Sequence, residues 1–214
     1  MKRFLTLGAG IALLATAGCS SIYYGTMEKF GVHKRDIMVD RVKEARDAQQ
    51  DAKKQFASAL EQFKSVVNDK GGDLQAKYDK LSAELQRSEE RAKAVHDRIA
   101  AVEDVSDALF SEWRSELKQY SSDALRRSSQ QQYDATLAKY KQLIAAMKKA
   151  SARIDPVLAP LRDQVLFLKH NLNAKAIASL GDELVSVQTN VDSLVRDMES
   201  AIAEADAFIK TMQE

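Results

Sequence analysis

The chain has 214 residues, 45% hydrophobic and 29% charged, so it holds enough apolar material for a core and is not a disordered chain. Its 32 basic and 31 acidic residues leave a net charge of +1, which gives no electrostatic basis for binding nucleic acid. Two prolines and eight glycines favour long helices over a sheet with many turns, and a single cysteine excludes an internal disulfide framework.

The N-terminal residues have the layout of a secretory signal peptide. Lys2 and Arg3 precede an apolar stretch over residues 4–14, and small residues then lead to Cys19. The apolar stretch is shorter than the roughly 20 residues that a membrane-spanning helix needs. We therefore predict a lipoprotein signal peptide over residues 1–18.

Cys19 is the more specific feature of this region. Small residues before a lone cysteine resemble the lipobox of bacterial lipoproteins, in which the cysteine carries diacylglycerol and begins the mature chain. Thr16 stands where that motif most often has Leu, so a signal peptide without lipidation is the alternative. The resemblance implies a membrane anchor through lipid on Cys19. Ser20, in place of Asp, favours the periplasmic side of the outer membrane over the inner membrane.

Residues 19–36 show no clean period and are predicted to form a lipidated tether. Their last residues include the cationic cluster His33-Lys34-Arg35, which either contacts anionic lipid or is a solvated run of charge. A single helical-bundle domain is expected over residues 37–214.

From Met38 onward, apolar residues recur with alternating spacings of four and three, which is typical of a helix with a buried seam. The first seam consists of Met38, Val42, Ala45, Gln49, Ala52, Phe56, Ala59, Phe63 and Val66. Gly71-Gly72 should end this helix, and Asp73 should cap the next one. The second seam consists of Leu74, Tyr78, Leu81, Leu85, Ser88, Ala92, Val95, Ile99, Val102, Ser106, Leu109 and Trp113, continuing to Leu117 and Tyr120.

Polar runs at residues 121–123 and 128–129 predict the next connection. The third seam consists of Tyr133, Leu137, Tyr140, Ile144, Met147, Ser151, Ile154, Leu158, Leu161, Val165 and Leu168. Pro156 and Pro160 interrupt it without shifting its register, which predicts a bend rather than a reversal of direction. The fourth seam consists of Ile177, Leu180, Leu184, Val187, Val191, Leu194, Met198, Ala201, Ala205, Phe208 and Met212.

Each stretch of about 40 residues corresponds to a helix roughly 60 Å long. Short breaks make consecutive helices antiparallel neighbours. We therefore predict an all-α fold, an elongated antiparallel helical bundle or coiled coil of about four long helices. Alanines on the first and last seams predict that these two helices pack against each other. The alternative is a helical hairpin that closes its seams by forming a homo-oligomer.

No motif for catalysis or cofactor binding is present: the sequence contains no P-loop, no HExxH, no CxxC and no Glu-x-x-His. His33, His96 and His170 lie on separate segments, which disfavours a zinc site. We expect no enzymatic activity, no cofactor and no metal site.

Residues 163–180 are the most unusual stretch, because a dense apolar run is followed by Lys169, His170, Asn171 and Asn173 at a break. These four residues are a candidate partner surface. The alternative is a buried segment with a polar helix end, in which an asparagine caps the helix and Lys169 and His170 face the last carbonyls.

Four segments carry a family resemblance: YYGTMEKFGVHKRDIMVDRVKEARDAQ (23–49), GGDLQAKYDKL (71–81), LFSEWRSEL (109–117) and DQVLFLKHNLNAKAIASL (163–180). The chain resembles the family catalogued as domain of unknown function 2959. The resemblance implies a bacterial helical envelope protein, often a lipoprotein, and it supplies no activity and no catalytic residues.

The expected function is therefore that of a non-enzymatic periplasmic lipoprotein, a scaffold, spacer or adaptor whose partner is an envelope protein or the cell wall. The alternative is a membrane-remodelling or envelope-stress coiled-coil protein that oligomerises on the bilayer.

Overall fold

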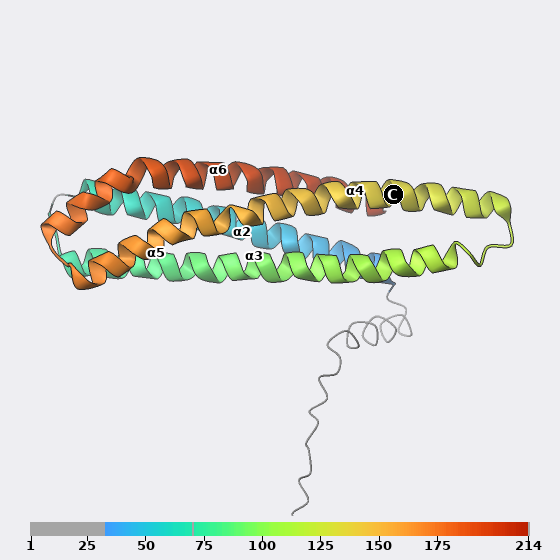
Figure 1. The fold of residues 1–214 in the computed structure, drawn as a ribbon, viewed down its shortest axis with the longest axis horizontal. Helices are drawn as coiled ribbons and strands as arrows, with labels where there is room; N and C mark the ends of the chain where they lie inside the picture. The colour runs from blue at the N-terminus through green and yellow to red at the C-terminus, as the bar shows by residue number, and fades with distance from the viewer. Residues whose placement is uncertain (1–32, 70, 214) are drawn as a thin grey trace, which may run out of the picture.

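A computed structural model describes residues 33–69 and 71–213, which form helices and, within those ranges, no strand. The helices are α2 (Lys34–Asn68), α3 (Leu74–Glu116), α4 (Asp123–Ala152), α5 (Ile154–His170) and α6 (Ala174–Gln213). Figure 1 shows α4 and α5 running end to end, so the chain forms an elongated bundle of four antiparallel arms. The predicted all-α elongated bundle is confirmed. The predicted signal peptide, Cys19 and the tether up to residue 32 lie outside the described residues.

The start of α2 corrects the predicted boundary between tether and bundle. The helix begins at Lys34, three residues before the expected domain start at residue 37. Lys34 Nζ lies 2.8 Å from the Glu112 carboxylate of α3, and Arg35 Nε donates a 2.8 Å hydrogen bond to the Met212 carbonyl of α6. The cations expected at lipid or in solvent instead fasten the start of α2 to two other helices.

The turn between α2 and α3 has the predicted chemistry. Gly72 adopts a φ of +83°, a conformation that side chains disfavour. The Asp73 carboxylate accepts a 2.8 Å hydrogen bond from the Gln75 backbone N–H and so caps α3. The break at Gly71-Gly72 and the cap at Asp73 are both confirmed.

The turn between α3 and α4 is shorter than the polar residues suggested. Ser122 caps α4, and Ser128 and Ser129, which the sequence assigned to the connection, lie inside that helix. The predicted second seam continued to Tyr120, which is wrong for that residue. Helix α3 ends at Glu116, and Tyr120 lies beyond it and is 41% exposed.

The hydrophobic core runs along the whole bundle. All nine residues of the first predicted seam are buried, and in the fourth only Leu184 is partly exposed. α2 packs against both α3 and α6, as the alanines predicted. Ala45, Ala52, Ala201 and Ala205 are completely buried.

The third predicted seam is only partly correct. Met147 and Ile154 are buried as expected, but Leu143 and Ala150 are also fully buried, whereas their predicted neighbours Ile144 and Ser151 are partly exposed. The buried line on α4 therefore passes through residues 136, 143 and 150 instead of 137, 144 and 151.

The prolines bend the third arm without reversing it. Pro156 lies in the first turn of α5, where its missing N–H removes no helical hydrogen bond, and Pro160 lies inside the helix. Figure 1 shows α5 continuing in the direction of α4 with a change of angle, which confirms the predicted bend.

One end of the bundle consists of only two helices. Figure 1 shows α3 and α4 extending past the start of α2 and the end of α6. The extension has a small core of its own, formed by Phe110, Leu117 and Tyr133 with Trp113 and Tyr140 against them. The rings of Trp113 and Tyr133 meet edge to face at 5.6 Å. We call residues 113–135 the hairpin tip.

Candidate functional site

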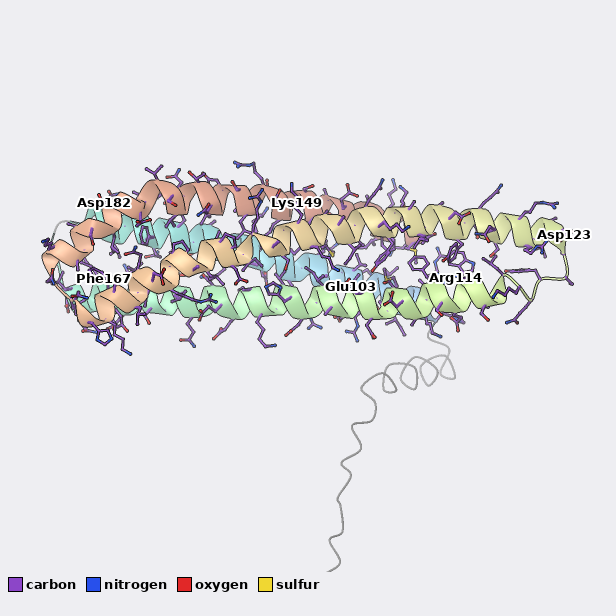
Figure 2. All side chains as sticks on the ribbon, viewed as in Figure 1. Glu103, Arg114, Asp123, Lys149, Phe167 and Asp182 are labelled. Atoms are coloured by element: carbon purple, nitrogen blue, oxygen red, sulfur yellow. The ribbon has the colours of Figure 1, made fainter. Side chains whose placement is uncertain are left out.

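The predicted partner surface lies at the other end of the bundle, where α5 turns into α6. Lys169 and His170 end α5, and Asn171 and Asn173 form the turn. All four residues are exposed, so the structure places them together at one end of the rod. Figure 2 labels Phe167 and Asp182 at this end.

Both asparagines hold the turn. The Asn171 side-chain amide donates to the Phe167 carbonyl at 3.0 Å and so satisfies the end of α5. The Asn173 side-chain oxygen accepts from the Ala176 N–H at 3.0 Å and caps α6. The capping interpretation of the asparagines is therefore confirmed, and Lys169 and His170 remain as the side chains free of a capping role.

Sequence reasoning missed two apolar residues of this end. Leu166 is 59% exposed and Phe167 is 45% exposed, so the expected fully buried segment is wrong, although Leu168 is buried. Leu166 and Phe167 lie four and three residues before His170, so each is a neighbour of His170 on the surface of α5. We call Leu166, Phe167, Lys169 and His170 the α5 end surface. The signal was available, because the seam through Leu161, Val165 and Leu168 leaves residues 166 and 167 off the core face.

The histidines do not converge. His33 precedes α2, His170 ends α5, and His96 Nδ1 lies 2.9 Å from the Ser151 hydroxyl in the middle of the bundle. Across residues 33–69 and 71–213, no group of three or more His, Cys, Asp or Glu side chains is placed to hold a metal ion.

A cavity of about 450 Å³ lies where the four-arm bundle narrows to the hairpin tip. Three of its polar groups are bonded to other parts of the chain: Arg35 to the Met212 carbonyl, Glu112 to Lys34, and the Trp113 indole N–H to the Ser129 hydroxyl at 2.9 Å. These contacts tie the end of the bundle together.

The carboxylate of Asp197, in the middle of the bundle, has two cationic partners. Asp197 of α6 is buried and accepts hydrogen bonds from Lys149, at 2.8 Å, and from Arg153. Burial raises the pKa of Asp197, but the hydrogen bonds from the two cations outweigh it and hold the pKa below its ordinary value. Lys149 lies in the last turn of α4, where Figure 2 labels it, and Arg153 is the residue between α4 and α5. This carboxylate therefore fastens the joint to α6.

None of the helices in the described residues combines the length and the hydropathy that a membrane span requires. A family model described as "Protein of unknown function (DUF2959)" matches residues 23–212. The match covers nearly all of α2 to α6 and begins ten residues before the described body. No curated protein matches the chain.

Proposed function

The chain belongs to the DUF2959 family, whose function is unknown, and we propose that it is a non-enzymatic lipoprotein that acts as a spacer or adaptor on the periplasmic side of the outer membrane. The observation that carries this proposal is the rod itself. α2 alone has 35 residues and is therefore about 52 Å long. The α5 end surface thus lies about 50 Å from residue 34, and residue 34 follows Cys19 closely in the chain.

The proposed mechanism is mechanical. Lipid on Cys19 holds the chain at the membrane, and the bundle carries the α5 end surface away from the point where α2 begins. Leu166 and Phe167 offer exposed apolar area, and Lys169 and His170 lie beside them. An apolar centre with polar neighbours is the usual composition of a protein-binding patch. An envelope protein or the cell wall is the proposed partner.

The distribution of apolar residues favours a spacer over a coiled-coil polymer. A protein that assembles through its seams needs a seam exposed in the single chain. In the described residues one large hydrophobic core contains seam residues from all the helices, and a small second core buries the aromatic residues near the hairpin tip. This supports the spacer proposal over membrane remodelling by oligomerisation.

The anchoring step is tested by Cys19→Ala. We expect the variant to leave the membrane fraction, or to accumulate as an unprocessed precursor, because the lipid would be the covalent anchor. Fractionation of cells followed by detection of the chain measures the result, and Ser20→Ala is the matched control that should stay at the membrane. A Cys19→Ala chain that is still processed and still requires detergent for release would contradict the lipoprotein proposal.

A further inference from the structure

The hairpin tip is the end of the rod nearest to the start of α2. The contacts of Lys34 with Glu112 and of Arg35 with the Met212 carbonyl mark the level at which α2 begins and α6 ends. Figure 1 shows the turn between α3 and α4 beyond that level, at the end of the rod that α2 and α6 do not reach. Figure 2 labels Asp123 at this end and Phe167 at the opposite one.

Two large apolar side chains are exposed at the hairpin tip. Tyr120 is 41% exposed and Leu125 is 60% exposed, and they flank the cap residue Ser122. Leu117 is buried in the aromatic cluster, so the turn is held by the small core beneath it. Tyrosine and leucine are residues that enter the boundary between lipid headgroups and acyl chains.

The same tip carries an excess of positive charge. Residues 114–127 contain four cations and two carboxylates. Arg126 is paired with Asp123 at 2.6 Å, and Arg114 donates to the Tyr133 hydroxyl at 3.1 Å. Lys118 and Arg127 form no ion pair with any residue that the structure describes. Two uncommitted cations therefore lie beside the exposed Tyr120 and Leu125.

We propose that the hairpin tip is a second membrane contact that binds an anionic phospholipid surface. Tyr120 and Leu125 enter the interface, and Lys118 and Arg127 pair with lipid phosphates. Anionic lipid attracts basic residues within about a Debye length of the surface. The tip thus combines apolar and electrostatic contributions to lipid binding.

The inference rests on the proposed function, because lipid on Cys19 would hold the chain at the same bilayer. The chain advances 14 positions from Cys19 to His33 and so reaches at most about 50 Å, and α2 begins beside the hairpin. A single point of attachment leaves a rod free to tilt. Attachment at two points directs the α5 end surface away from the membrane.

The test uses the chain from Ser20 onward, which lacks the lipidated cysteine and retains every described residue. Vesicles of phosphatidylcholine, with and without phosphatidylglycerol, are titrated into the protein, and bound protein is separated by sedimentation. We expect binding to the anionic vesicles that weakens with salt. Lys118→Gln with Arg127→Gln should weaken it by about 25-fold, because each cation near an anionic surface contributes about fivefold. Tyr120→Ser with Leu125→Ser should also weaken it.

The matched control makes the same kind of change at the other end of the rod. Leu166→Ser with Phe167→Ser, and Lys169→Gln with Lys175→Gln, should leave vesicle binding unchanged, and thermal unfolding should show that every variant is folded. Equal binding to neutral and anionic vesicles, wild-type binding by the tip variants, or an equal loss in the control variants would overturn the proposal. The result is independent of the Cys19→Ala experiment, so failure of the anchor and failure of the tip are distinguishable.

Discussion

Gln49 is a polar residue placed in the centre of an apolar helix seam. Its side chain is completely buried, and neither its amide nitrogen nor its amide oxygen has a hydrogen-bond partner among the described residues. The buried serines differ: Ser88 donates to the Glu84 carbonyl at 2.8 Å and Ser106 to the Glu103 carbonyl at 2.7 Å. An unsatisfied buried amide costs about 1–3 kcal/mol, so Gln49 lowers the stability of α2 in the bundle.

Replacing this amide should stabilise the protein. Gln49→Met keeps the length of the side chain and removes the unsatisfied groups, so we expect the free energy of unfolding to rise by about 1–3 kcal/mol. Urea denaturation of the chain from Ser20 onward measures it. Gln86→Met, on an exposed face of α3, is the control and should change stability by less than about 0.5 kcal/mol. A less stable Gln49→Met variant would show that the amide is hydrogen-bonded, for example to an internal water.

Some residue contacts are invisible to sequence reasoning because their partners are remote. Lys34 and Arg35 form a cationic cluster in the sequence, which favours lipid or solvent, yet their partners Glu112 and Met212 are 78 and 177 positions away. A local pattern shows only that these residues are charged. The carbonyl at the end of a distant helix, which Arg35 satisfies, exists only once the bundle has formed.

The seam of helix α2 was predictable residue by residue because its members follow one line of four-and-three spacing, although Ile37, Val39 and Leu60 are buried beside that line. Helix α4 was not, because two adjacent faces are equally suitable. Thr136, Leu143 and Ala150 form one line, and Leu137, Ile144 and Ser151 form the next, while Met147 and Ile154 belong to both interpretations. Packing of α4 against α6 and α3 selects the first line.

The choice of face on α4 gives a test with adjacent residues. Leu143→Ala should cost about 2–5 kcal/mol, because Leu143 is fully buried and its removal leaves a cavity. Ile144→Ala should cost about half as much, because Ile144 is partly exposed. The denaturation midpoints of the two variants show which substitution causes the larger loss of stability. The seam predicted from the sequence contains Ile144 and requires the opposite order. A larger loss of stability for Ile144→Ala would therefore show that Ile144, and not Leu143, faces the core.

In helix α5, hydropathy alone gives the wrong burial for part of an apolar run. Four consecutive apolar residues, 165–168, suggest a buried segment, but a helix turns 100° per residue and cannot direct all four to one core. The seam gives the two positions that face the core, half-buried Val165 and buried Leu168, and the remaining two, Leu166 and Phe167, become an exposed face. Exposed apolar residues at a helix end are therefore better found by extending the four-and-three spacing of the buried residues to that end than by hydropathy alone.

At the scale of the whole molecule, the two ends of the rod have different chemistry. The hairpin tip has exposed apolar side chains, free cations and a separate aromatic core, and it lies near the start of α2. The α5 end surface lies at the opposite end, with its turn held by Asn171 and Asn173. A spacer requires two different ends, since one end must face the membrane anchor and the other must remain available to a partner.

The spacer proposal also requires that the rod keep its length in solution as a single chain. α3 has 43 residues and is therefore about 65 Å long, and a rod of that length has a radius of gyration above about 20 Å. A compact globule of this chain length would have a radius of gyration of about 17 Å. Small-angle scattering of the chain from Ser20 onward measures the radius of gyration, and light scattering measures the mass of the particle. We expect a monomer with the larger radius, because one large core within the single chain contains seam residues from all the helices of the described residues. A radius near that of a globule would rule out a spacer. A dimer or larger assembly would instead favour the oligomerising alternative, because some apolar surface of the bundle would then be covered by a second copy.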